Sequence, residues 1–176
     1  MNKTNDANRD ERPATVADKE KFSSGGKRHM IVLRGKWGLA IDKALLWLTG
    51  YSLMTKQYCV ALGTDYQETL LLKTIGAKTG KLRITGLPYH RVNGNYVVRG
   101  SNGGGPTDPH WVFNIRSNPP AWVRVNRRWC PVKAHVASGE ERQQLYEVLC
   151  KKNHTTRRYQ AMCKPRELPL VVLRPL

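Results

Sequence analysis

The chain has 176 residues, enough for one domain with its own hydrophobic core, so it needs none of the disulfides or metals that stabilise very small domains. Hydrophobic residues make up 40% of it and charged residues 24%, which is ordinary for a globular protein, whereas the net charge of +17 is not.

The excess positive charge lies in the middle of the sequence. Residues 1–26 contain five basic and five acidic side chains and so contribute no net charge. Between Thr69 and Gly139, eleven Lys and Arg residues accompany a single acid, Asp108. Two interpretations stay open: a solvated basic face, or a surface for a polyanion such as a phosphorylated cofactor, nucleic acid or anionic lipid.

Several classes of site are disfavoured. The histidines show no metal-ligand spacing, and neither a nucleophile elbow nor a Walker loop is present, so we expect no metal. The most apolar stretch, 37–53, is interrupted by Asp42 and Lys43 and falls short of the roughly 20 residues that a spanning helix needs. No secretory signal is visible, and the scattered cysteines predict a reducing, cytoplasmic location. These cysteines are Cys59, Cys130, Cys150 and Cys163.

The N-terminal part predicts a tail and one helix. Residues 1–29 are polar, which predicts disorder. From Lys36 to Thr49 apolar residues recur at helical spacing, and Gly50 predicts the end of this helix. The apolar stripe either packs on its own domain or, since it contains Trp37 and Trp47 beside cations, lies on the inner face of the cell membrane.

The rest of the chain predicts short antiparallel strands with helices between them. The Asn93-Gly94 pair is a strong hairpin signal, because both central positions of a type I′ turn need positive φ. Asp108-Pro109 predicts a helix N-cap followed by proline at the first helical position. The pattern indicates an α+β fold with a partly open barrel. Expected strands are 69–75, 82–91, 96–99, 121–125, 129–136 and 168–174, and expected helices begin after Pro109 and cover 139–152 and 157–163.

Two glycine-rich loops are candidates for ligand binding. Residues 76–83 combine two glycines and a hydroxyl with three cations, which suits phosphate, although an ordinary basic turn has the same composition. Residues 100–106 offer backbone amides to a flat ring, or form a flexible connector.

Four segments, in order, resemble the deazaflavin-dependent nitroreductases, a branch of the flavin-reductase-like split barrels. The resemblance covers about Gln67 to Pro175. The segments are Leu70–Leu72 with Gly76–Thr85, then Gly100–Gly104, then Pro109–Asn114 with Asn118-Pro119, and finally Tyr159-Gln160 ahead of Leu168–Leu173.

The resemblance implies a mostly antiparallel split β-barrel with flanking helices, forming a cofactor-binding domain over 66–176 after an N-terminal helix and linker over 30–65. It implies hydride transfer from reduced coenzyme F-420 (8-hydroxy-5-deazaflavin) to a small acceptor: a quinone, nitroaromatic or enone. By position, the phosphate and acidic tail would bind Lys78, Thr79, Lys81 and Arg83. The ring would lie near Ser101, Asn102, Gly103, Trp111 and Asn114. Tyr159 would lie over the substrate pocket, where it would hydrogen-bond or protonate the acceptor, or simply pack.

Alternatives remain at this stage. The same barrel accommodates flavin mononucleotide (FMN), and a non-catalytic basic module is a further possibility, although no nucleic-acid motif is evident. The oligomeric state is open. Four departures from the family pattern point to a different acceptor or to low activity. They are Gly86 in place of proline, Pro88 interrupting its strand, Asn102 in place of lysine, and Thr156 in place of an aromatic partner for Tyr159.

Overall fold

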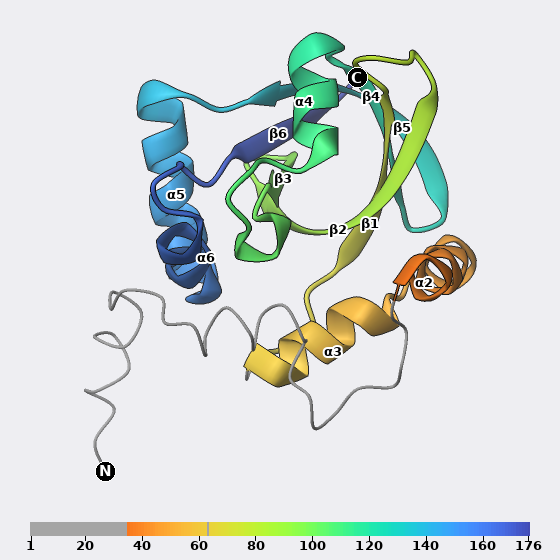
Figure 1. Ribbon diagram of the computed structural model, residues 1–176, viewed down its shortest axis with the longest axis horizontal. Helices are drawn as coiled ribbons and strands as arrows, with labels where there is room; N and C mark the ends of the chain where they lie inside the picture. The colour runs from red at the N-terminus through yellow and green to blue at the C-terminus, as the bar shows by residue number, and fades with distance from the viewer. Residues whose placement is uncertain (1–34, 63) are drawn as a thin grey trace.

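The computed structural model describes residues 35–62 and 64–176, so the predicted tail over 1–29 lies outside the described residues. The described part contains helices on several sides of a six-stranded barrel (Figure 1). Its elements are α2 (Gly35–Thr49), α3 (Leu53–Leu62), β1 (Thr69–Ile75), β2 (Leu82–Val92), β3 (Asn95–Arg99), η1 (Asn102–Gly104), α4 (His110–Ser117), β4 (Pro120–Val125), β5 (Arg128–Val136), α5 (Gly139–Lys152), α6 (Thr155–Cys163) and β6 (Leu170–Pro175).

The strands form one antiparallel barrel in the order β1-β2-β3-β6-β5-β4. The α+β barrel expected from the sequence is therefore confirmed, but it is closed rather than partly open. It closes because β1 is paired on both edges: Leu72 lies opposite Thr85 of β2 and opposite Val123 of β4. No strand of the described barrel is left with an unpaired edge.

Both predicted hairpins have left-handed backbone at their two central residues. The φ angles are 49° at Asn93 and 79° at Gly94, and 49° at Asn126 and 63° at Arg127. Pro88, expected to interrupt β2, does not do so: β2 runs through it to Val92. Proline has no N–H to give to the sheet, and the bonding continues at the next residue, Tyr89, whose N–H donates to the Glu68 carbonyl at 3.0 Å.

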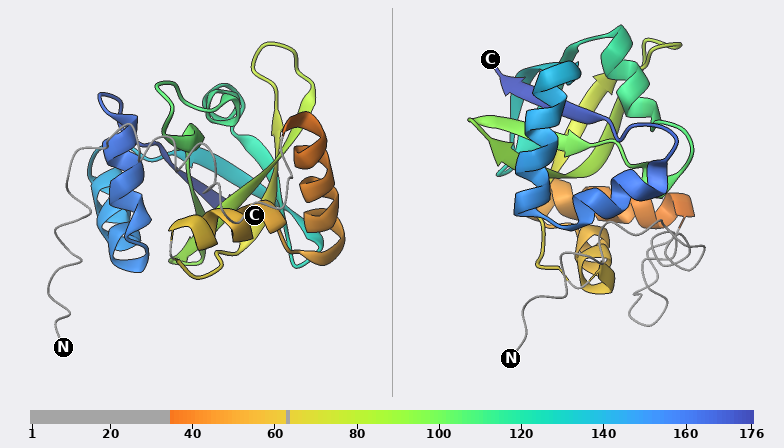
Figure 2. Two further views of the ribbon diagram at one scale, coloured as in Figure 1. Left: turned by 60° about the horizontal axis from the view of Figure 1, so that its bottom comes forward. Right: turned by 90° about the vertical axis from the view of Figure 1, so that its left-hand side faces the viewer.

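The barrel interior is filled by alternate residues of the strands, as the period of two requires. Helix α4 closes one end with Trp111, Val112 and Ile115, which belong to the same apolar cluster as the inward-facing strand residues. A second cluster lies on the outside, where α5 and α6 pack on β3 and β6; it contains Val97, Leu149, Cys163, Leu168, Leu170 and Val172. Figure 2 shows α5 and α6 on a different flank of the barrel from α2 and α3.

Helix α2 covers part of β1 and β2. Its predicted end is confirmed and its start lies one residue earlier than predicted; it ends where Gly50, at φ 77°, donates its N–H to the Leu46 carbonyl at 3.0 Å. The packing of α2 explains why residue 86 is a glycine, because a Cβ at this position would lie 3.2 Å from the Leu46 side chain. Arg124 holds the end of the helix by donating to the Trp47 carbonyl at 3.1 Å and lying over its ring.

Helix α3 was assigned to a linker in the sequence analysis, and this was wrong. The Ser52 hydroxyl accepts a bond from the Thr55 N–H at 3.0 Å, as an N-cap does. The buried Asp42 carboxylate of α2 accepts bonds from Ser52 Oγ at 2.8 Å and from the Met54 N–H at 3.0 Å. Since half of this cap comes from α2, the two helices are fixed to each other.

Candidate active site

A cavity of about 530 Å³ lies between the barrel and the helices α2 and α3. Its lining comes from these helices, from β2, from the end of β3 and the loop after it, and from α4 and α6. The volume is typical of pockets for drug-sized organic molecules. The structure brings together here five of the residues that the sequence analysis assigned to the site: Ser101, Asn102, Gly103, Trp111 and Tyr159.

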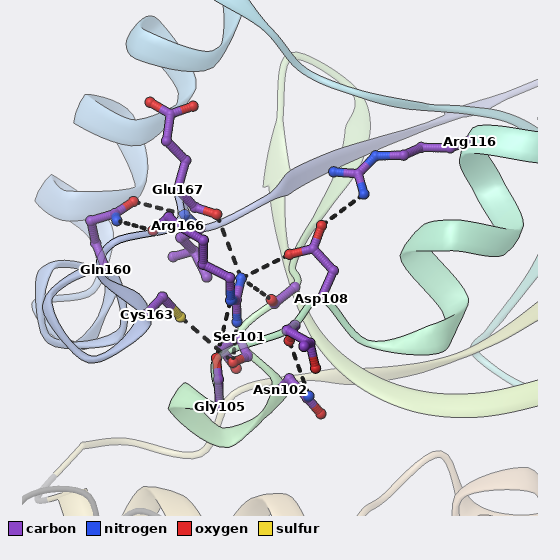
Figure 3. Close-up of polar contacts among 12 residues, drawn as sticks. Ser101, Asn102, Gly105, Asp108, Arg116, Gln160, Cys163, Arg166 and Glu167 are labelled. Atoms are coloured by element: carbon purple, nitrogen blue, oxygen red, sulfur yellow. Dashed lines mark hydrogen bonds and ion pairs between the residues drawn. The ribbon is translucent and has the colours of Figure 1, made fainter.

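The loop after β3 is ordered by one arginine (Figure 3). The Arg166 side chain donates to the carbonyl oxygens of Ser101 at 2.8 Å, Gly105 at 3.1 Å and Gly100 at 3.3 Å. Its Nη1 also forms an ion pair with Asp108 Oδ1 at 2.9 Å. The expectation of a flexible connector is therefore wrong, because Arg166, distant in sequence, binds this loop at both ends.

Asp108 does not act as a helix N-cap, contrary to the sequence analysis. The cap position of α4 is Pro109, and no side chain caps it. The Asp108 carboxylate is used by two arginines instead: Arg166 at 2.9 Å and Arg116 at 2.7 Å. The Asp108 carboxylate bonds to the arginines rather than to a backbone N–H of α4, because hydrogen bonds between ions are about twice as strong as neutral ones.

The backbone of the same loop requires glycine. Gly103 and Gly104 have φ of 63° and 83°, a region that other residues adopt at a cost. A Cβ at Gly104 would collide with the Met162 side chain of α6. Asn102, also at positive φ, is held by a bond from its Nδ2 to the Thr107 carbonyl at 3.1 Å. Of the two glycines, Gly104 allows α6 to approach the loop, and Gly103 gives the cavity lining a point without a side chain.

The basic turn between β1 and β2 lies apart from the cavity lining. The predicted tail-binding residues Lys78, Thr79, Lys81 and Arg83 are all exposed on it. The turn is closed by the Gly76 N–H, which donates to the Lys81 carbonyl at 2.9 Å. It connects to the cavity through β2, whose residues 84–88 line the cavity.

Asn114, the remaining predicted residue, is buried and does not line the cavity. Its Oδ1 accepts a bond from the Ala77 N–H at 3.0 Å, and its Nδ2 donates to Thr74 Oγ1 at 3.0 Å. Asn118 donates to the Ile75 carbonyl at 3.4 Å. Helix α4 therefore positions the basic turn, and Asn114 contributes through that turn.

Arg99 is a lining residue that the sequence analysis did not single out. Its Nη1 donates to Oγ1 of Thr155 and of Thr156, at 3.0 Å each, and its Nη2 to Gln67 Oε1 at 3.0 Å. Thr156, one of the departures from the family pattern, is fully buried and accepts this bond. Burial lowers the pKa of Arg99 from its ordinary value. A basic residue directly before a glycine-rich loop was the signal in the sequence.

Tyr159 lies beside Arg99, with the guanidinium carbon 5.2 Å from the ring centre. Burial raises the pKa of Tyr159 to about 12, against the opposing effect of the Arg99 charge. The phenol is therefore protonated at neutral pH.

The fold and this site together define a class: reductases built on the flavin-reductase-like split barrel. The family model described as F420H(2)-dependent quinone reductase matches residues 51–175. The F420H(2)-dependent quinone reductase of Mycobacterium tuberculosis strain H37Rv is 32% identical over 108 residues, which cover 60% of this chain and 72% of that protein.

Comparison with solved structures supports the same family. One described as an F420-H2 dependent reductase, FDR-A, is 31% identical with a TM-score of 0.54 and covers 60% of this chain and 93% of its own. Another, described as a domain-swapped dimer, is 26% identical with a TM-score of 0.55 and covers 78% of this chain and 97% of its own. The chain belongs to the F420H(2)-dependent quinone reductase family. It is an oxidoreductase whose cofactor is coenzyme F-420, and the alternatives of FMN and of a non-catalytic module are set aside.

The described residues fit this cofactor. Gly103 lines the cavity and has open space where a Cβ would stand, so the backbone at this point suits a flat ring. The exposed cations of the basic turn suit a phosphate and a chain of carboxylates. Among residues 35–62 and 64–176, no helix is long and apolar enough to cross a membrane.

Proposed function

We propose that the cavity binds the deazaflavin ring against Ser101, Asn102 and Gly103, and that a quinone is reduced beside it under Tyr159. The observation that carries this is the lining of the cavity: the glycine-rich loop and Tyr159 border the same volume of about 530 Å³. The bound coenzyme supplies the hydride. The protein holds both rings together and excludes water, which converts a bimolecular reaction into one within a complex.

We further propose that Lys78, Lys81 and Arg83 hold the phosphate and acidic tail of the coenzyme, with the Thr79 hydroxyl beside them. All four residues are exposed, and the turn contains no acidic residue. Strand β2 leads from this turn to the cavity wall at Thr85, so a ligand with its ring in the cavity can lay its tail along β2.

The test is a fluorescence titration of the protein with oxidised coenzyme F-420. The double variant Lys78→Ala with Arg83→Ala removes two charge-assisted contacts and is expected to weaken binding about tenfold or more. Lys133→Ala with Arg174→Ala is the matched control, since it removes the same charge from an exposed pair on β5 and β6. Equal losses in both variants would show that only net charge matters and would overturn the assigned tail site.

We propose, second, that α2 rests on an anionic membrane surface. Trp37, Ile41, Ala44 and Leu48 share one face of the helix by their spacing, and all of them are exposed. The exposed fractions of Trp37 and Leu48 are 84% and 58%. The described residues leave this face of α2 exposed, and Leu39, on another face of the helix, borders the cavity. An exposed apolar face of this kind is typical of helices that lie on a membrane surface.

Sedimentation with vesicles that contain anionic lipid tests this second proposal. Ile41→Ser with Leu48→Ser is expected to lower the bound fraction severalfold, because it removes apolar area from the stripe. Val60→Ser with Phe113→Ser is the control, since these side chains are similarly exposed on α3 and α4. Equal sedimentation of both variants and the wild type would contradict the assignment.

A further inference from the structure

Arg99 is a cation placed on the outer face of the barrel under α6. Along β3, Tyr96 and Val98 belong to the barrel core, whereas Val97 belongs to the cluster packed under α5 and α6. Because strand side chains alternate, Arg99 points to the same side as Val97. There it borders the cavity together with Tyr159.

The partners of Arg99 in the described chain are neutral. Its three hydrogen bonds reach two hydroxyls and an amide, from Thr155, Thr156 and Gln67. A guanidinium has five N–H donors, so these bonds do not exhaust it. Among the described residues no carboxylate pairs with it, in contrast to Arg166, which pairs with Asp108. A desolvated cation with neutral partners attracts an anion strongly.

The nearby charges do not neutralise Arg99. Among the described residues, Asp42 is the only one whose carboxylate lines the cavity, and Ser52 Oγ and the Met54 N–H already donate to it. His90, on the neighbouring strand β2, has its pKa lowered to about 4, first by burial and then by the charges of Arg99 and Lys152. The histidine is therefore neutral at pH 7, and the field on this side of the cavity is positive.

We infer that Arg99 binds the acceptor oxygen that becomes negatively charged during the reaction, and so selects acceptors that leave as a phenolate or enolate. This rests on the proposed quinone reduction. A hydride carries one proton and two electrons, so its transfer turns a quinone into a hydroquinone monoanion, and one further proton completes the hydroquinone. Arg99 stabilises the anion by charge. Tyr159, beside it, holds a phenolic proton within the same cavity.

The test uses 4-nitrophenol with the protein free of coenzyme, because only the phenolate form of this probe absorbs visible light. At a pH below the pKa of the free probe, binding to the wild type is expected to raise the phenolate band. Arg99→Gln is expected to weaken phenolate binding at least about tenfold, and Arg99→Lys less, because lysine keeps the charge but loses the planar fork. Arg91→Gln, an exposed arginine on β2, is the charge-matched control with no expected effect.

Two further measurements distinguish a loss of phenolate binding from misfolding of the variant and from a loss of coenzyme binding. Melting curves confirm that each variant folds, and Arg99→Lys keeps the test valid should Arg99→Gln be unstable. The titration with oxidised coenzyme is expected to give the same affinity for wild type and Arg99→Gln, while kcat/KM for a quinone falls at least about tenfold. Phenolate binding that survives Arg99→Gln, or a matching loss of coenzyme affinity, would overturn the inference. Phenolate binding without any coenzyme binding would contradict only the proposed function.

Discussion

The two glycine-rich loops differ in charge and in how they are held in place. The segment over 76–83 exposes its three cations, and its turn is held by its own backbone and by Asn114 of α4. The loop over 100–106 contains no cation of its own and is held by the distant Arg166. The first provides charge without a fixed side-chain position, and the second provides a fixed surface without charge. A ligand with an acidic tail and a flat ring needs both.

Removal of the Arg166 side chain is expected to have the largest effect. Arg166→Met takes away the bonds to three carbonyls and leaves the partly buried Asp108 with one partner, so we expect a loss of about 2–4 kcal/mol in the free energy of unfolding. Urea denaturation measures it. Arg116→Met is the control, because this half-exposed arginine makes a single ion pair worth less than about 1 kcal/mol. Equal losses would show that Arg166 is not what orders the loop.

Asn114→Ala is expected to rank second. It leaves the Ala77 N–H and the buried Thr74 hydroxyl without their partner, at a cost of about 1–3 kcal/mol in unfolding free energy. Coenzyme affinity should also fall, since the turn that carries the cations loses its support. A stability loss with unchanged coenzyme affinity would show that the position of the turn does not matter for binding.

The two loops differ in how much they tolerate a methyl group. Gly80→Ala and Gly104→Ala both place alanine at positive φ, which costs about 1 kcal/mol. Only at Gly104 does the new methyl group meet a neighbour, Met162, while the space at Gly80 is open. We expect the Gly104 variant to unfold with at least about 1 kcal/mol less free energy than the Gly80 variant. Identical melting curves would contradict this difference.

The charges of the basic turn are expected to matter least for stability. Lys78→Ala with Arg83→Ala should change the free energy of unfolding by less than about 0.5 kcal/mol, because both side chains are exposed. The same variant is expected to lose coenzyme affinity, so these side chains would serve binding and not folding. A large loss of stability, measured in urea, would mean that the turn is part of the structural support and not only a binding surface.

Local signals in the sequence were sufficient for most of the barrel. The hairpin at Asn93-Gly94 and the end of α2 at Gly50 depend on residues that tolerate positive φ, and both are confirmed. The sequence could not show contacts between distant segments. Asp108 resembles an N-cap until its partner Arg166 is known. Pro88 resembles a strand breaker until the next N–H is seen to reach Glu68.

The candidate site was likewise predictable only where its residues carry a local signal in the sequence. Ser101, Asn102 and Gly103 lie in a conspicuous loop, and the structure places them in the cavity lining with Tyr159. Arg99 and the helix α3 were missed, because a single basic residue and a serine followed by a weakly patterned segment carry little local signal. Their roles become visible only when β3, α6 and α2 are assembled around one cavity.

The proposed binding mode can be tested by a crystal structure of the protein with oxidised coenzyme F-420. We expect the deazaflavin ring inside the cavity, in contact with the backbone of Ser101–Gly103, and the acidic tail along β2 toward Lys78 and Arg83. A ring bound anywhere outside the cavity lining, or a tail directed away from the basic turn, would contradict it.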